Sequence, residues 1–263
     1  MYAFTFEQPT ALDEAQRLAA AGGKPLAGGQ TLLASMKLRL SAPEQLVDLG
    51  RCKELSGIGL QNGELVIGAM TRHAEVAVNP QVREAYPALA DLASRIGDRQ
   101  VRAMGTLGGS VANNDPAACY PSAVLASCAT IVTTQREIAA DDFFLGLFAT
   151  SLEEGELIKA IRFPLPKQAA YEKLRQKASH FPLVGVFVAR FDDGVRVAVT
   201  GAGNGVFRHA GLEQALSQAF TAQAAGGVEI DASELNSDLH GTAAYRANLI
   251  SVLAQRAVIK ASR

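Results

Sequence analysis

Two glycine-rich segments constrain the fold of this chain more than any other feature of its sequence. The first, residues 27–31 (AGGQT), follows a short apolar stretch and precedes an apolar-periodic run. The second, residues 105–110 (GTLGGS), is followed by NNDP at residues 113–116. Glycine lets a backbone approach a ligand closely, and free amide groups in such loops bind anions. Both segments are therefore candidate diphosphate sites, and ordinary turns are the alternative.

The spacing of apolar residues predicts an α+β chain. A helix is expected from Leu12 to Ala19, with Thr10 and Asp13 as an acidic capping box. The dipeptide at residues 62–63 (NG) between two apolar runs predicts a hairpin. The other predicted helices are residues 32–40, a mostly helical stretch at 71–97, and residues 121–127, 211–220 and 242–261. The other predicted strands are residues 25–27, 46–49, 130–138, 157–163, 171–176, 183–191 and 195–200.

The segment at residues 164–166 (PLP) is the predicted domain boundary, because the pattern of elements changes after it. We expect a first domain at residues 1–166, in two lobes of about 1–54 and 55–166. A smaller α+β domain, an antiparallel sheet with helices, is expected at residues 167–263.

The common nucleotide and hydrolase fingerprints are absent. Val206 stands where a G-x-G-x-x-G motif starting at Gly201 needs its last glycine, and Pro25 follows Lys24 where a P-loop needs Ser or Thr. No G-x-S-x-G occurs either. These absences argue against Rossmann dehydrogenases, P-loop NTPases and serine hydrolases.

Cysteine content and charge exclude further classes. Cys52, Cys119 and Cys128 form no CxxC pair and have no histidine at zinc-ligand spacing, so we expect neither a metal ligand nor an iron–sulfur cluster in this chain. The 25 Lys and Arg residues and 26 Asp and Glu residues give a net charge of −1, which argues against nucleic acid as a partner. No signal peptide or membrane segment is evident, and a cytoplasmic protein is expected.

Both glycine segments resemble motifs of one flavoprotein family. Residues 27–31 with MKLR at 36–39, and residues 106–110 with DP at 115–116 and Pro121, resemble the two FAD-binding motifs of the medium subunits of molybdenum hydroxylases. This is the carbon monoxide dehydrogenase and xanthine dehydrogenase family. The resemblance continues in YEK at residues 171–173 and YR at 245–246, and so covers nearly the whole chain.

The resemblance implies a two-lobed FAD-binding domain of the vanillyl-alcohol oxidase type, followed by the family's C-terminal domain. It implies an oxidoreductase subunit whose FAD takes electrons from [2Fe-2S] clusters in a small partner subunit and passes them to an external acceptor. A large partner subunit would oxidise the substrate at a molybdopterin, in a dimer of heterotrimers. The cofactor would carry the chemistry, so no catalytic residue is expected in this chain.

The resemblance also implies which residues bind the cofactor. They are Leu26, Ala27, Gly28, Gly29, Gln30, Thr31, Leu32, Thr106, Gly108, Gly109, Ser110, Asn114, Asp115, Cys119, Lys173 and His180. Many relatives have an aspartate where this chain has Cys119, and others have one near the position of His180. Loss of these carboxylates is expected to raise the reduction potential of the flavin, and a purely packing role for Cys119 is the alternative.

Two other functions are compatible with the sequence. One is a stand-alone FAD-dependent reductase of the same fold, although no serine–glutamate pair stands out as its proton donor. The other is a non-catalytic nucleotide-binding or regulatory module. A yellow purified protein would exclude the second of these.

Overall fold

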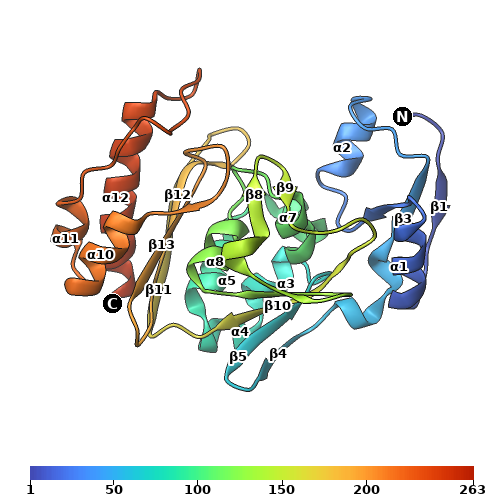
Figure 1. The fold of residues 1–263 in the computed structure, drawn as a ribbon, viewed down its shortest axis with the longest axis horizontal. Coiled ribbons are helices and arrows are strands. Elements are labelled where there is room, and N and C mark those ends of the chain that lie inside the picture. The colour runs from blue at the N-terminus through green and yellow to red at the C-terminus, as the bar shows by residue number, and fades with distance from the viewer.

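The computed structural model describes residues 1–263, and its elements form three layers of structure along the long axis of the molecule (Figure 1). The N-terminal layer is a small parallel sheet in the order β1-β3-β2. Its strands are β1 (Thr5–Glu7), β2 (Lys24–Leu26) and β3 (Gln45–Asp48), and its helices are α1 (Leu12–Ala20), α2 (Leu32–Lys37) and the short 3-10 turns Leu49–Arg51 and Lys53–Leu55. A small core buries Leu12, Ala15 and Val47 between α1 and β3.

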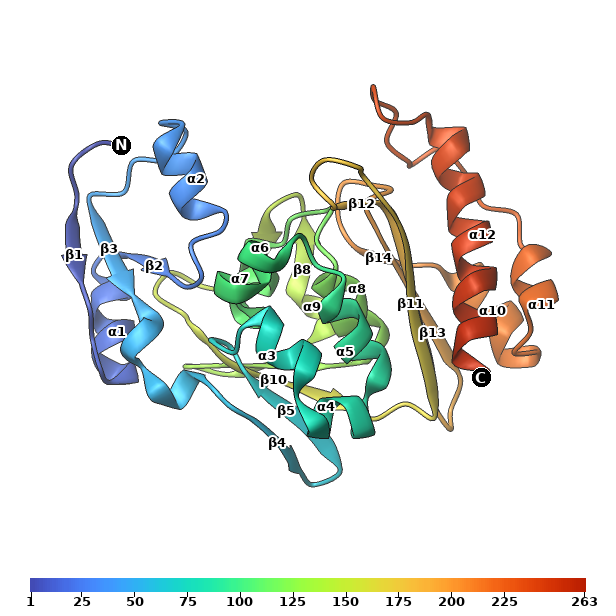
Figure 2. The same cartoon turned by 180° about the vertical axis from the view of Figure 1, so that it is seen from behind.

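The middle layer is an antiparallel sheet in the order β4-β5-β10-β6-β7. Its strands are β4 (Ile58–Gln61), β5 (Glu64–Gly68), β6 (Thr130–Thr133), β7 (Glu137–Ala139) and β10 (Ile158–Pro164). Its helices are α3 (His73–Val78), α4 (Pro80–Ala85), α5 (Pro87–Ser94), α6 (Arg99–Met104), α7 (Leu107–Asn113), α8 (Tyr120–Ala126) and α9 (Ala140–Phe143). The small hairpin β8 (Phe144–Gly146) and β9 (Ala149–Thr150) stands beside them (Figure 2).

The C-terminal layer is a second antiparallel sheet, in the order β11-β12-β13-β14. Its strands are β11 (Gln168–Arg175), β12 (Pro182–Arg190), β13 (Val195–Thr200) and β14 (Phe207–Arg208). The helices α10 (Ala210–Gln218), α11 (Ala222–Gly226) and α12 (Ala243–Ala261) lie on its outer side (Figures 1 and 2).

Alternation along β12 explains why this sheet is buried on both faces. Val186 and Val188 point toward the outer helices, whereas Phe187 and Ala189 join the large core beneath α5 and α8. Successive side chains of a strand point to opposite faces, so this one apolar strand contributes side chains to two hydrophobic cores. The C-terminal sheet is thus held between α12 and the helices of the middle layer.

The expected α+β class, with a C-terminal antiparallel sheet and helices, is confirmed. The Asn-Gly turn is also present, with Asn62 and Gly63 at positive φ between β4 and β5. The Thr10 and Asp13 capping box is wrong, because α1 begins after Ala11 without a side-chain cap. The short helix α11 has no counterpart among the predicted elements.

Candidate functional site

The first glycine segment connects β2 to α2 and presents unused hydrogen-bond donors. None of the five backbone N–H groups from Gly28 to Leu32 donates to a protein acceptor. Gly29 adopts φ +69°, a conformation that L side chains rarely adopt. Consecutive free amides in a tight turn form a concave site for an anion. This segment therefore has the donor set that a diphosphate needs.

The second glycine segment is helical, and the prediction of a loop with inward-facing amides is wrong. Residues 107–113 form α7, and Thr106 is its N-cap through a 3.2 Å hydrogen bond from the Gly109 amide to Oγ1. The amide of Leu107 donates to Thr71 and that of Gly108 to Ala69. Three glycines and two hydroxyl residues among the six positions 105–110 suggested a loop, but tertiary contacts with the β5–α3 connection favour a helix here. The hydroxyl of Ser110 makes no protein hydrogen bond.

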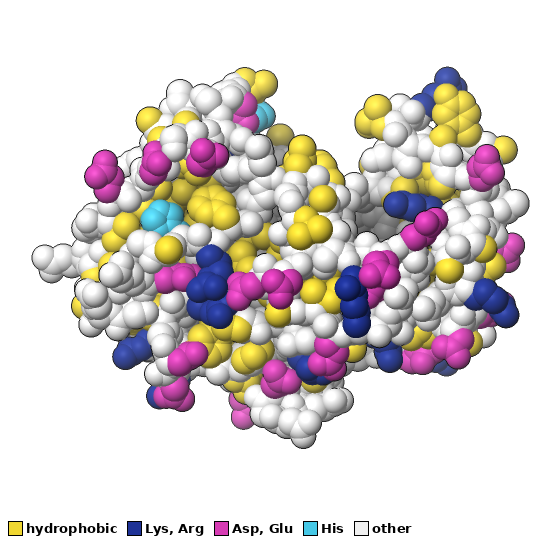
Figure 3. Space-filling view, in the orientation of Figure 1, with side chains coloured by type: hydrophobic (Ala, Val, Ile, Leu, Met, Phe, Trp, Pro, Cys, Tyr) yellow, Lys and Arg dark blue, Asp and Glu magenta, His cyan; other side chains and the backbone are white.

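The two segments, almost eighty positions apart in sequence, are in direct contact. A Cβ atom placed on Gly28 would overlap the carbonyl oxygen of Met104, and one placed on Gly109 would lie 3.2 Å from the Cβ of Ala27. The surface is hollowed between the lobe that carries α2 and the middle of the molecule (Figure 3). Glycine at these positions lets the two backbones approach each other closely.

A buried histidine packs against the second glycine segment. His73, 5% exposed at the start of α3, has no partner for its Nδ1 atom and lies with its ring centroid 5.2 Å from that of Tyr120. A Cβ atom on Gly105 would lie 2.6 Å from its Nε2 atom. Burial, with a smaller contribution from Arg102, lowers the pKa of His73 to about 4. The imidazole is therefore neutral at physiological pH.

Three of the predicted residues meet at the boundary between the middle layer and the C-terminal sheet. Lys173 Nζ donates to the carbonyl oxygens of Arg95 at 2.9 Å and His180 at 2.8 Å, and lies 3.5 Å from Cys119 Sγ. His180 has φ +60°, and its Nδ1 atom lies 3.2 Å from the carbonyl oxygen of Gly97. Lys173 and His180 thus join the α5–α6 connection to the β11–β12 connection.

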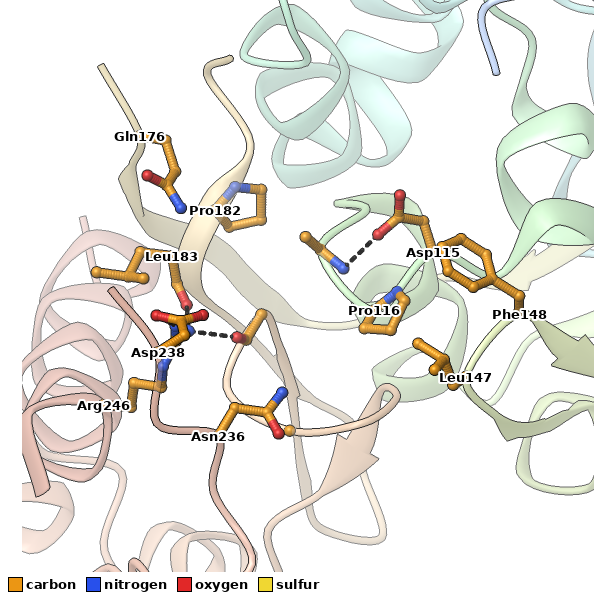
Figure 4. A pocket seen from close by; sticks show the side chains of 13 residues that line it. Asp115, Pro116, Leu147, Phe148, Gln176, Pro182, Leu183, Asn236, Asp238 and Arg246 are labelled. Carbon is orange, nitrogen blue, oxygen red and sulfur yellow. Dashed lines mark hydrogen bonds and ion pairs between the residues drawn. The ribbon is translucent and has the colours of Figure 1, made fainter. Parts of the chain in front are cut away.

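Asn114 and Asp115 have local partners. Asn114 ends α7 in the left-handed conformation, and its Nδ2 atom donates to Gly146 and Ala149, which fixes the β8–β9 hairpin. Asp115 accepts the amide of Ala117 and lines a pocket of about 270 Å³ (Figure 4). The pocket lies between this segment, the β8–β9 turn and the C-terminal layer.

Arg246 of α12 forms the far wall of that pocket. It is 3% exposed and donates to the carbonyl oxygens of Leu183 at 2.9 Å and Gly201 at 2.7 Å. Its second nitrogen contacts both carboxylate oxygens of Asp238 at 2.8 Å. Together these contacts, around the residues labelled in Figure 4, fix α12 to β12, to the residue after β13 and to the preceding loop.

The sequence did not identify the groups that contact Lys173, His180 and the second glycine segment. The carbonyl oxygens of Arg95 and Gly97, and the side chain of His73, belong to segments whose patterns showed only helices. No sequence signal identifies a backbone carbonyl as a partner across 78 or 83 positions. No group of three His, Cys, Asp or Glu side chains is placed to hold a metal ion. None of the helices has both the length and the apolar character needed to cross a bilayer.

Comparison with known proteins gives consistent results. Residues 2–166 match the model of the FAD binding domain in molybdopterin dehydrogenase. The chain is 36% identical to the carbon monoxide dehydrogenase medium chain of Hydrogenophaga pseudoflava, over 97% of this chain and 96% of the relative. It is 32% identical to the nicotine 6-hydroxylase medium subunit of Paenarthrobacter nicotinovorans, over 98% and 97%.

Similarity to solved structures extends over the whole length. A carbon monoxide dehydrogenase from Hydrogenophaga pseudoflava that lacks the Mo-pyranopterin moiety of its cofactor superimposes with a TM-score of 0.90, at 35% sequence identity. The match covers 99% of this chain and 98% of that one.

Proposed function

Because the chain belongs to the FAD-binding family of molybdopterin dehydrogenases, and its relatives are oxidoreductase medium subunits, we propose that it carries the FAD of a molybdenum hydroxylase. In this role it takes electrons from [2Fe-2S] clusters of a partner chain and passes them to an external acceptor. The reducing substrate would be oxidised in another chain.

One observation carries the cofactor assignment: the five free amides from Gly28 to Leu32, opposite the helix that contains Gly109 and Ser110. A diphosphate accepts hydrogen bonds from amides and needs close backbone approach. The first segment supplies the donors, and the second supplies a glycine surface and a free hydroxyl. The residues present therefore fit FAD.

The remaining predicted residues are proposed to shape the flavin end of the site. FAD, when bound, supplies the redox chemistry, and the protein orients and tunes it. Lys173 has all three donors directed to protein acceptors, so its proposed role is to position the segments around Gly97 and His180 and to add positive charge nearby. Cys119, as the neighbour of Lys173, would influence how much positive charge the amine carries.

The partners are proposed to be a small iron–sulfur subunit and a large molybdopterin subunit, in a dimer of heterotrimers. The relatives carry the names medium chain and medium subunit. The β8–β9 hairpin beside the site leaves Leu145, Leu147 and Phe148 each more than half exposed. Adjacent exposed apolar side chains are typical of a protein–protein interface.

The division into residues 1–166 and 167–263 is proposed as the domain organisation. The FAD-binding model ends at residue 166, and the C-terminal sheet begins with β11 at Gln168. The cofactor would lie mainly on the first domain, and the second would cover its flavin end through Lys173 and His180.

The test is flavin binding by the purified full chain, with FAD, FMN and riboflavin compared by fluorescence quenching. FAD is expected to bind at least tenfold more tightly than FMN, because FMN lacks the diphosphate that the free amides recognise. Equal affinities would contradict the assignment of the amides. Reduction of an artificial acceptor by the isolated chain with a nicotinamide would instead indicate a stand-alone reductase.

A further inference from the structure

Cys119 and Lys173 form a sulfur–nitrogen pair between two parts of the chain. Cys119 lies at the start of α8 and Lys173 in β11, and their Sγ and Nζ atoms are 3.5 Å apart. Both residues are more than nine-tenths buried, with exposed fractions of 5% and 8%. Water therefore has little access to either side chain, and the two groups stay next to each other.

Lys173 has no carboxylate partner. Besides Cys119, its Nζ atom contacts only the carbonyl oxygens of Arg95 and His180. Burial is the main cause that lowers the pKa of Lys173. A larger fraction of this amine is consequently unprotonated than for an exposed lysine, and an unprotonated amine has the lone pair needed for bond formation.

The other two cysteines provide an internal comparison. Cys52 Sγ lies against the carbonyl oxygens of Pro9 and Ala11, at 3.4 and 3.8 Å. The thiol of Cys128 makes no hydrogen bond, and the residue is only partly buried. Of the three thiols, only that of Cys119 has an amine beside it.

We propose that Cys119 and Lys173 are a redox-reversible modification site, at which dioxygen joins the two side chains through a nitrogen–oxygen–sulfur bridge. One thiol, one amine and one dioxygen give the bridge and one water. The S–H bond, one N–H bond and the O–O bond break, and S–O and O–N bonds form. Sulfur and nitrogen each lose two electrons, and the two oxygen atoms gain four. The Sγ and Nζ atoms are 3.5 Å apart. A bridge through one oxygen atom spans more of this distance than a direct sulfur–nitrogen bond, so it requires a smaller movement of the two side chains.

The bridge would change the surroundings of the proposed flavin site. It would tie α8 covalently to β11 and remove the ammonium charge of Lys173. It would also withdraw donors from the carbonyl oxygens of Arg95 and His180, which belong to the two connections that Lys173 holds together. The site would therefore respond to oxygen independently of any cofactor.

Thiol counting on the full chain tests the proposal. Aerobic protein, unfolded in the presence of a maleimide, is expected to show two reactive thiols out of the three cysteines, and dithiothreitol should restore the third. Cys119→Ser should show two thiols with or without reductant. Cys52→Ser, the matched control, should show one thiol before reduction and two after it.

Tryptic mass analysis identifies the link. Cleavage after Lys173 should fail in the oxidised protein, and the peptides of Cys119 and Lys173 should appear joined, about 14 Da heavier than their sum. Lys173→Arg should abolish the joined peptides and keep all three thiols. Three free thiols in aerobic wild type, oxidation confined to Cys119, or joined peptides that lack the added oxygen would each overturn the proposal.

Discussion

The backbone of Gly28 packs against the carbonyl group of Met104, so closely that a methyl group on Gly28 would overlap the oxygen. Gly28→Ala is therefore expected to push the first glycine segment away from the second. Because the free amides from Gly28 to Leu32 are proposed to hold the diphosphate, FAD affinity should fall at least tenfold, or about 1.4 kcal/mol. The measurement is FAD titration of the apoprotein by flavin fluorescence.

A matched glycine gives the control for this prediction. A Cβ atom on Gly59, in β4, meets no atom within 4 Å. Gly59→Ala should bind FAD like the wild type. If Gly28→Ala also binds FAD normally, the two segments do not form one diphosphate site.

The proximity of Cys119 and Lys173 predicts an effect on the flavin potential. Cys119→Asp places a carboxylate beside the Nζ atom, which offsets its positive charge and disfavours an anionic reduced flavin. The midpoint potential of the loaded protein should fall by about 30 mV, which corresponds to about 1.4 kcal/mol in a two-electron couple. Cys119→Asn, which is similar in size but neutral, should leave the potential near that of the wild type. An unchanged potential in Cys119→Asp would restrict Cys119 to packing.

His73 predicts a loss of stability in acid. Its pKa is lowered to about 4 by burial, whereas an unfolded histidine titrates near its ordinary value of about 6.5. Between these two pH values the unfolded chain binds the proton and the folded chain does not, so stability decreases as the pH falls. The loss due to His73 should reach about 2 kcal/mol at pH 5 and about 3 kcal/mol below pH 4.

Urea unfolding of wild type and His73→Gln at a series of pH values measures this contribution. The difference in free energy of unfolding between the two proteins should change with pH only below about 6.5. A difference that stays constant down to pH 4 would mean that His73 is protonated in the folded state.

Arg246 predicts a large loss of stability when its charge is removed. Arg246→Met removes the donor of the carbonyl oxygens of Leu183 and Gly201 and the ion-pair partner of Asp238, which keeps only backbone amide donors. Loss of one partner of a buried ion pair costs about 3 kcal/mol or more. Because the carboxylate of Asp238 is 45% exposed, water compensates part of that cost, and we expect about 2 kcal/mol.

Chemical denaturation of Arg246→Met, Asp238→Asn and the double variant separates these contributions. The double variant should be less destabilised than the sum of the two single ones, since the residues interact directly. Additive effects would show that the carbonyl contacts of Arg246, and not Asp238, account for its stabilisation.

The sequence predicted those helices and turns that are determined by neighbouring residues alone. The Asn62-Gly63 hairpin and α12 follow from turn chemistry and apolar spacing, and both are present. Residues 107–113 fold as α7 despite two glycines, because their amides pair with Ala69 and Thr71, which local propensity does not describe.

For the candidate site, the sequence identified the residues but not the contacts between them. Its two glycine segments stand out in the sequence, but their contact through Gly28 and Met104 depends on tertiary structure alone. Lys173 was predicted from a resemblance to bind the cofactor. Its three protein acceptors lie on separate segments of the chain, so its part in joining those segments was visible only after folding.

The exposed apolar tip of the β8–β9 hairpin predicts a contact with a partner subunit. Leu147 and Phe148 are 60% and 57% exposed, although burial of such side chains is favourable by about 1.5–3 kcal/mol each. The double variant Leu147→Ser with Phe148→Ser should therefore copurify with much less iron–sulfur and molybdopterin subunit when the three chains are produced together. FAD content is measured on the same preparations, since both side chains also line the pocket beside Asp115 and a loss of FAD would place them in the cofactor site. Leu60→Ser, which alters a 50% exposed leucine on β4, is the control and should assemble normally. Normal assembly of the double variant would place the partner on another surface.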